Sequence, residues 1–299
     1  MLPRASDIAP GDLRPLWALR TRSRFSAATL AGRVVRCFRE GMEITDSADG
    51  TPIAYTRTGE GPVVVIVNGA LSTASDADGL ATALVHAGLQ AVVFDRRARG
   101  SSGDVRGSTP EREVEDLAAV IDAVGGRASV LGHSSGAVLA LVAASGGVPI
   151  DALFLSEPPL RFGVDEPADD LAERLQALVD DGEGAEAVTT FQLENVGLPR
   201  DMVDQMRASE QFADLVPLAQ SCVYDTLLVR QASTPTREML TVSQPVTVIR
   251  GEQTFPVLIT AADRLAEEIA QAELVVVPES VMHRPDPAAT ARVVRDRVS

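Results

Sequence analysis

Short apolar runs recur along the chain and are separated by amphipathic stretches. The run Val63–Val67 is continuously β-branched, which indicates a strand buried on both faces. Similar short runs follow at residues 91–94, 128–131, 152–155, 246–249 and 274–277. Ahead of the first run, polar and apolar residues alternate on both sides of Asp49-Gly50, a pair typical of a hairpin turn.

Helical patterns lie between these runs. Pro110 opens a stretch whose apolar residues recur at helical spacing, and Gly125-Gly126 ends it. Further helices are predicted at residues 75–86, 137–144 and 261–271, and from Pro287 onward. This alternation predicts an α/β fold with a doubly wound, mostly parallel sheet. Ligands of such sheets bind beyond the carboxyl ends of the strands.

Residues 160–243 interrupt the alternation with a helical, acidic segment. Because it is inserted between two strands at the carboxyl edge of the sheet, we expect it to form a cap over the site. The domain prediction is therefore a core of residues 42–159 and 244–299 with a helical cap at 160–243. Large apolar residues of this segment either line a pocket or form the core of the cap: Phe191, Met202, Met206, Phe212 and Tyr224.

Residues 1–41 form a basic N-terminal extension, rich in Arg in a chain that is otherwise acidic. The extension is either a docking arm or lid, or an ordinary extension ahead of Met42. We favour the second interpretation, so a chain that begins at Met42 is expected to stay soluble and active.

The amino-acid composition excludes several classes of partner and chemistry. A net charge of −15 argues against nucleic acid and membrane surfaces as partners. The sequence contains no Lys, which excludes Schiff-base chemistry on lysine. Its two Cys and three His give no metal-binding pattern, so neither a metal nor a cofactor is expected. The expected setting is the cytoplasm, and the oligomeric state is left open.

The pentapeptide Gly132-His133-Ser134-Ser135-Gly136 stands between a predicted strand and a predicted helix. A G-x-S-x-G sequence in that context is typical of a sharp turn that exposes the serine hydroxyl. The two glycines leave room for the turn, and the Ser135 N–H is expected to face the same space as Ser134 Oγ. From these residues the chain resembles the α/β-hydrolase superfamily, over about residue 42 to the C-terminus.

A serine nucleophile needs a base and an acid that orients it. The resemblance places the base after the last strand, which indicates His283 rather than His86 or His133. The acid of this superfamily often stands in a G-x-x-D pattern, but here Thr254 occupies the aspartate position. Two substitutes remain, Glu157 and Glu252. Glu157 ends the strand that follows the nucleophile strand, and the resemblance includes relatives whose acid stands at that place. We favour Glu157.

The resemblance also implies an oxyanion hole formed by the backbone N–H groups of Ala70 and Ser135. The turn at residues 95–100 resembles the D-x-x-G-x-G turn of the superfamily, and its arginines are expected to be structural or at the surface.

The sequence therefore predicts a serine hydrolase with a Ser134-His283-Glu157 triad. Its substrate would be a small, largely apolar molecule with an ester, thioester, amide or C–C acyl bond. The alternatives are a lyase or cyclase of the same fold, and a ligand-binding member without a complete triad.

Overall fold

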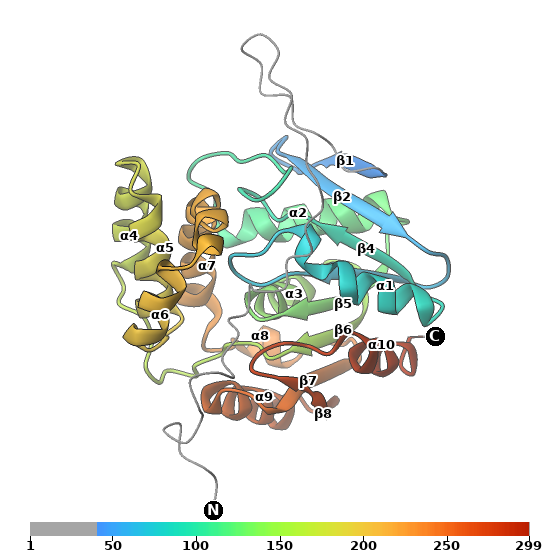
Figure 1. Ribbon diagram of the computed structural model, residues 1–299. Coiled ribbons are helices and arrows are strands. Elements are labelled where there is room, and N and C mark those ends of the chain that lie inside the picture. Colours follow the sequence, from blue (N-terminus) through green and yellow to red (C-terminus); the bar gives the residue numbers. More distant parts are fainter. Residues whose placement is uncertain (1–40, 299) are drawn as a thin grey trace, which may run out of the picture.

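The computed structural model describes residues 41–298. The basic N-terminal extension predicted at residues 1–41 therefore lies, except for its last residue, outside the described residues. Eight strands form one sheet in the order β1-β2-β4-β3-β5-β6-β7-β8 (Figure 1). The strands are β1 (Met42–Asp46), β2 (Pro52–Thr58), β3 (Val63–Val67), β4 (Gln90–Phe94), β5 (Ala128–His133), β6 (Ile150–Ser156), β7 (Val246–Gln253) and β8 (Ala272–Val281).

The sheet is mostly parallel, as predicted. β1 and β2 form the expected antiparallel hairpin, and β2 also runs antiparallel to β4. From β4 to β8 every neighbouring pair is parallel. The carboxyl ends of β3 to β8 therefore meet at one edge, where ligands of such sheets bind.

Helices cover both faces of the sheet, which confirms the doubly wound α/β fold. On one face α1 (Asp78–His86) packs with α10 (Pro287–Arg295). On the other lie α2 (Pro110–Ala123), α3 (Ser135–Ser145) and α9 (Pro256–Glu268). In β3 the side chains alternate between the two cores, because successive strand residues point to opposite faces.

The residues between β6 and β7 form a helical insertion. Its helices are α4 (Leu171–Asp180), α5 (Gly184–Thr190), α6 (Arg200–Arg207), α7 (Ala219–Ala232) and α8 (Arg237–Leu240). In Figure 1, α4 to α7 stand together at the left of the sheet, with α7 nearest to it. The apolar core of the insertion also packs against Ala70, Leu71 and Ala98, in the loops that follow β3 and β4. The insertion thus contacts the loops at the carboxyl ends of these two strands.

Several element boundaries differ from the predicted ones, most clearly those of α9 and β8. The helix predicted at 261–271 is α9, which begins at Pro256; proline suits a first helical position because its missing N–H would have no partner there. The strand predicted at 274–277 is β8, which extends to Val281 and pairs with β7 as far as Gln253. The full length of β8 is not evident from the sequence because the strand contains polar residues and a proline, which an edge strand tolerates.

One helical stretch of the described residues, Glu210–Ala232, is long and apolar enough to cross a membrane by length and composition. Of its most apolar window, 67% is buried inside the fold, as in the core helix of a soluble protein. By itself this stretch is weak evidence for a membrane span.

Candidate active site

The predicted nucleophile lies in a sharp turn between β5 and α3. Ser134 has φ 56° and ψ −127°, a backbone conformation that residues other than glycine rarely adopt. Its N–H donates to the Ser156 carbonyl at 2.9 Å, which ties the turn to the end of β6. A Cβ at Gly136 would lie 2.1 Å from the Val67 carbonyl oxygen, so this position admits only glycine.

His283 and Glu157, predicted as base and acid, are hydrogen-bonded to each other. His283 Nδ1 lies 2.5 Å from Glu157 Oε2, across 126 residues of sequence. Glu157 directly follows β6, and its N–H donates to the Ile249 carbonyl of β7 at 2.9 Å. Two neighbouring central strands thus hold the carboxylate in place. The Glu157 side chain is 4% exposed and the His283 side chain 14%.

Two further donors hold the Glu157 carboxylate. The Gly251 N–H donates to Oε1 at 2.8 Å, and the Thr254 hydroxyl donates to Oε2 at 3.0 Å. Burial raises the pKa of Glu157, but the hydrogen bonds from His283 and Gly251 and the neighbouring imidazoles lower it below its usual value. Thr254, which occupies the usual aspartate position, therefore supports a carboxylate that arrives from another strand.

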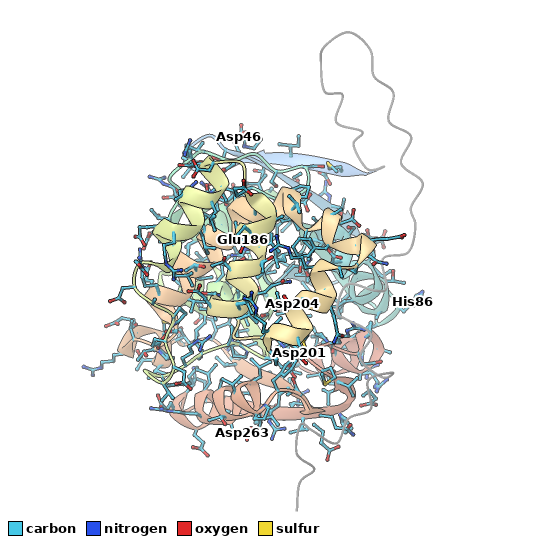
Figure 2. All side chains as sticks on the ribbon, turned by 60° about the vertical axis from the view of Figure 1, so that its left-hand side comes forward. Asp46, His86, Glu186, Asp201, Asp204 and Asp263 are labelled. Atoms are coloured by element: carbon cyan, nitrogen blue, oxygen red, sulfur yellow. The ribbon has the colours of Figure 1, made fainter. Side chains whose placement is uncertain are left out.

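Glu252, the alternative acid, is exposed at the end of β7. Within residues 41–298, the carboxylate that the structure brings to His283 is that of Glu157. His86, which the sequence rejects as the base, is likewise exposed and lies at the edge of the molecule (Figure 2).

His133 lies against the candidate base. Its ring centroid is 4.5 Å from that of His283, with the rings tilted by 36°. Burial and the adjacent His283 lower the pKa of His133 to about 3, against the opposing attraction of Glu157. His133 thus stays neutral at neutral pH. Ligand atoms of His133, Glu157 and His283 lie within 4.8 Å of one another, so these three side chains could also hold a metal ion.

The two residues predicted to form an oxyanion hole belong to a loop and a helix that adjoin the predicted nucleophile. Ser135 is the first residue of α3, where helix N–H groups have no partner within the helix. Ala70 follows Gly69 in the loop after β3, and this loop closely approaches the elbow. A Cβ at Gly69 would lie 2.8 Å from Ser134 Cβ and 3.4 Å from Ser134 Oγ. Glycine at 69 therefore lets the loop pass beside the serine.

Backbone strain gathers at this site. Of the eight non-glycine residues with positive φ among residues 41–298, three are the predicted triad: Ser134 at 56°, Glu157 at 48° and His283 at 61°. Two more, Leu71 and Ala98, stand in the loops after β3 and β4. Such conformations cost of order 1–3 kcal/mol each and gather where function requires a fixed geometry.

The three arginines of the turn at residues 95–100 are structural, one of the two expectations for them. Arg96, Arg97 and Arg99 are each at most 2% exposed, and each forms an ion pair with a buried carboxylate. The sequence shows these arginines, but it does not show that Asp225 of α7 is one of their partners, because the two segments are more than 120 residues apart.

The large apolar residues of the insertion mostly belong to its own core. Phe191, Phe212 and Tyr224 are buried in one cluster with the leucines of α4. They hold the insertion together, and among the two interpretations of these residues the structure supports the core.

A family model described as the alpha/beta hydrolase family matches residues 64–293. The chain belongs to this family. A crystal structure of an alpha/beta hydrolase from Sphaerobacter thermophilus is 39% identical, with a TM-score of 0.78, over 85% of this chain and 99% of that one.

Solved structures of lower identity share the fold. The enol-lactonase from Burkholderia xenovorans is 21% identical, with a TM-score of 0.62, over 84% of this chain and 98% of that one. A bottromycin epimerase is 24% identical, with a TM-score of 0.61, over 86% of this chain and 99% of that one. Among curated proteins, none matches the sequence.

Proposed function

We propose that this alpha/beta hydrolase is a serine hydrolase that cleaves an acyl bond of a small, largely apolar molecule. Ser134 is the nucleophile, His283 the general base and Glu157 the acid that orients it. The N–H groups of Ala70 and Ser135 form the oxyanion hole. Further parts of the proposal are that the insertion at residues 160–243 caps the site and that the enzyme works in the cytoplasm.

The observation that supports this proposal best is the hydrogen bond between His283 Nδ1 and Glu157 Oε2. When Nδ1–H donates to the carboxylate, the imidazole is held in the tautomer whose Nε2 is free to accept a proton. The buried carboxylate also stabilises the imidazolium that forms when that proton arrives. A surface histidine would require no buried, triply hydrogen-bonded carboxylate at its other nitrogen.

The roles proposed for these residues give the following reaction. Ser134 Oγ attacks the acyl carbon as its proton passes to His283 Nε2, and the carbonyl oxygen becomes negative beside the Ala70 and Ser135 amides. The imidazolium returns the proton to the leaving group, and the acyl group stays on Ser134. His283 then takes a proton from a water molecule as the water attacks the acyl-enzyme, and it returns that proton to Ser134 Oγ as the acyl–Oγ bond breaks and the acid is released.

Labelling with a fluorophosphonate tests the proposal. We expect covalent labelling of the wild-type protein and hydrolysis of at least one short-chain aryl ester, and loss of both in Ser134→Ala. The control is Ser145→Ala, at the far end of α3, which should keep both. A wild-type protein that is folded but neither labels nor hydrolyses any ester would contradict the proposal and favour a ligand-binding or non-hydrolytic role.

A further inference from the structure

Arg99 joins the oxyanion loop to the helical insertion. Its Nη1 donates to the Gly69 carbonyl oxygen at 2.7 Å, and its Nη2 donates to Asp225 Oδ2 of α7, also at 2.7 Å. Both ends of the pair are buried, since the Arg99 side chain is 0% exposed and that of Asp225 is 1% exposed. One planar guanidinium therefore connects two segments that lie far apart in the sequence.

Arg96 contacts the same carboxylate and the same loop as Arg99. Its Nη1 donates to the Asn68 carbonyl at 3.3 Å and to Ser135 Oγ at 3.1 Å, and lies 3.0 Å from Asp225 Oδ1. Its other nitrogens bind Glu113 of α2 through two contacts of 2.8 Å. Two arginines and two carboxylates thus form a neutral cluster around residues 68, 69 and 135, which flank or include both residues of the oxyanion hole.

The Gly69–Ala70 peptide gives this cluster a consequence for catalysis. In a planar trans peptide the C=O and the following N–H point in opposite directions. When Arg99 fixes the Gly69 carbonyl, it also fixes the direction of the Ala70 N–H. Glycine at position 69 has no Cβ to hinder rotation of this peptide, so the loop depends on such an anchor for a single orientation.

We infer that Arg99, held by Asp225 of the insertion, is a positioning residue that keeps the Ala70 amide directed into the oxyanion hole. This inference rests on the proposed serine hydrolase function. It makes the insertion part of the catalytic apparatus, because α7 supplies the carboxylate that orients Arg99. A shift of α7 would loosen the Gly69–Ala70 peptide and weaken the oxyanion hole without touching the triad.

The chain offers a matched control in the same turn. Arg97 is as buried as Arg99 and also binds a buried carboxylate, Asp116, at 2.6 and 2.7 Å. Its other partners are Asp49, Ser108 and the Arg112 carbonyl, none of which belongs to the oxyanion loop. Arg97→Lys therefore removes an equally buried guanidinium that does not contact the oxyanion loop.

The test compares Arg99→Lys with Arg97→Lys. Lysine keeps the charge, but its single ammonium cannot bridge the Gly69 carbonyl and Asp225 in the planar geometry of arginine. We expect kcat for an ester to fall at least about tenfold in Arg99→Lys with KM changed less than about threefold. That loss is part of the 10²- to 10³-fold that removal of an oxyanion donor costs. Arg97→Lys should keep kcat within about threefold, although both variants lose stability.

A second measurement separates positioning from general damage. A thionoester places sulfur, a weaker hydrogen-bond acceptor, in the oxyanion hole, so it gains less from the hole than the matching ester. Arg99→Lys should therefore reduce the ratio of ester to thionoester rates at least about fivefold, and Arg97→Lys should leave it unchanged. Equal losses of kcat in the two variants, or an unchanged ratio in Arg99→Lys, would overturn the inference.

A crystal structure of Arg99→Met provides a readout that does not depend on activity. We expect the Gly69–Ala70 peptide to be rotated or to adopt more than one orientation, and an unmoved, singly oriented peptide would contradict the anchor. If the wild-type protein shows no labelling, the proposed function fails, and this structure still decides whether Arg99 holds the loop. If Arg99→Met does not fold, the same peptide is examined in Arg99→Lys.

Discussion

At the scale of single residues, Glu157 has the most specific proposed role, that of the acid that orients His283. Its carboxylate is buried, held by two donors besides His283, and placed at the end of a central strand. Glu157→Gln removes the negative charge, so the imidazolium loses its partner and the tautomer of His283 is no longer fixed. We expect kcat to fall by at least about a hundredfold.

Glu252→Gln is the matched variant for that measurement, because the side chain is exposed at the end of β7. It should change kcat by less than about fivefold. Both variants are compared by steady-state kinetics on the same ester. A larger loss in Glu252→Gln than in Glu157→Gln would show that the acid is assigned to the wrong residue.

Thr254 has a contact with the site that its sequence position does not reveal. At the usual position of the acid it offers no charge, but its hydroxyl donates to Glu157 Oε2 at 3.0 Å. Thr254→Val keeps the shape and removes this donor, which leaves the carboxylate less firmly oriented. A hydrogen bond to a charged group contributes about 1.5–3 kcal/mol, and because only part of this is lost in the transition state, we expect kcat to fall about three- to tenfold. Thr254→Ser keeps the hydroxyl and should stay within about twofold; equal kcat in the two variants would exclude this role.

The lowered pKa of His133 predicts that the free energy of unfolding depends on pH. Its pKa is lowered from 6.5 to about 3 in the folded protein, first by burial and then by His283. The unfolded chain therefore binds a proton at His133 near pH 6.5, whereas the folded chain does so only near pH 3. The stability that this difference contributes is present above pH 6.5 and is lost as the pH falls from 6.5 towards 3.

Urea unfolding at pH 7.5 and pH 5 measures that contribution. Between these two values the wild-type free energy of unfolding should fall by about 1–2 kcal/mol more than that of His133→Gln. His86→Gln, at the exposed end of α1, is expected to keep the wild-type difference. An equal fall in wild type and His133→Gln would show that His133 is protonated in the folded protein.

At the scale of elements, the turn between β5 and α3 stores strain at Ser134. A φ of 56° with a ψ of −127° suits glycine and opposes any residue with a Cβ. Ser134→Ala and Ser134→Gly both remove the proposed nucleophile, but only the second relieves the backbone strain. We expect Ser134→Gly to be more stable than Ser134→Ala by about 1 kcal/mol, with ester hydrolysis abolished in both. Thermal unfolding checks the difference, and a glycine variant that is the less stable of the two would mean that this turn is not strained.

The elements were the most predictable part of the molecule from sequence. Buried parallel strands are short β-branched runs, so β3 stands out at its actual bounds. The elbow was predictable because its two glycines and its strand-to-helix context are local features. The length of β8 and the start of α9 were missed, since one is an edge strand with polar residues and the other begins in a turn-like Phe255-Pro256 pair.

At the scale of the whole molecule, the unpredicted features are contacts between distant segments. The choice of Glu157 over Glu252 could be argued from sequence because a rigid strand precedes it. The Arg99–Asp225 pair could not, since nothing local in α7 distinguishes one buried carboxylate as the partner of a turn 126 residues away. Loop anchoring of this kind is visible only when the core and the insertion are seen together.

At the scale of the whole molecule, the net charge of −15 also affects how the protein interacts with charged substrates. Acidic side chains such as Asp201 and Asp204 on α6 lie exposed on the insertion, and Figure 2 shows them on the side of the molecule that it presents. A protein of this charge repels anionic substrates at long range, and salt screens the repulsion because the Debye length is about 10 Å at 0.1 M and about 3 Å at 1 M.

We therefore expect kcat/KM for an ester that carries a carboxylate to rise about three- to tenfold between 20 mM and 500 mM NaCl. The neutral ester with the same acyl group should change less than about twofold, because it has no charge for the field to act on. The two substrates are compared with one enzyme preparation, so any effect of salt on the fold cancels in the ratio. If kcat/KM for the anionic ester fell as salt was added, the site would attract anions, and a locally positive entrance would have to outweigh the negative charge of the whole chain.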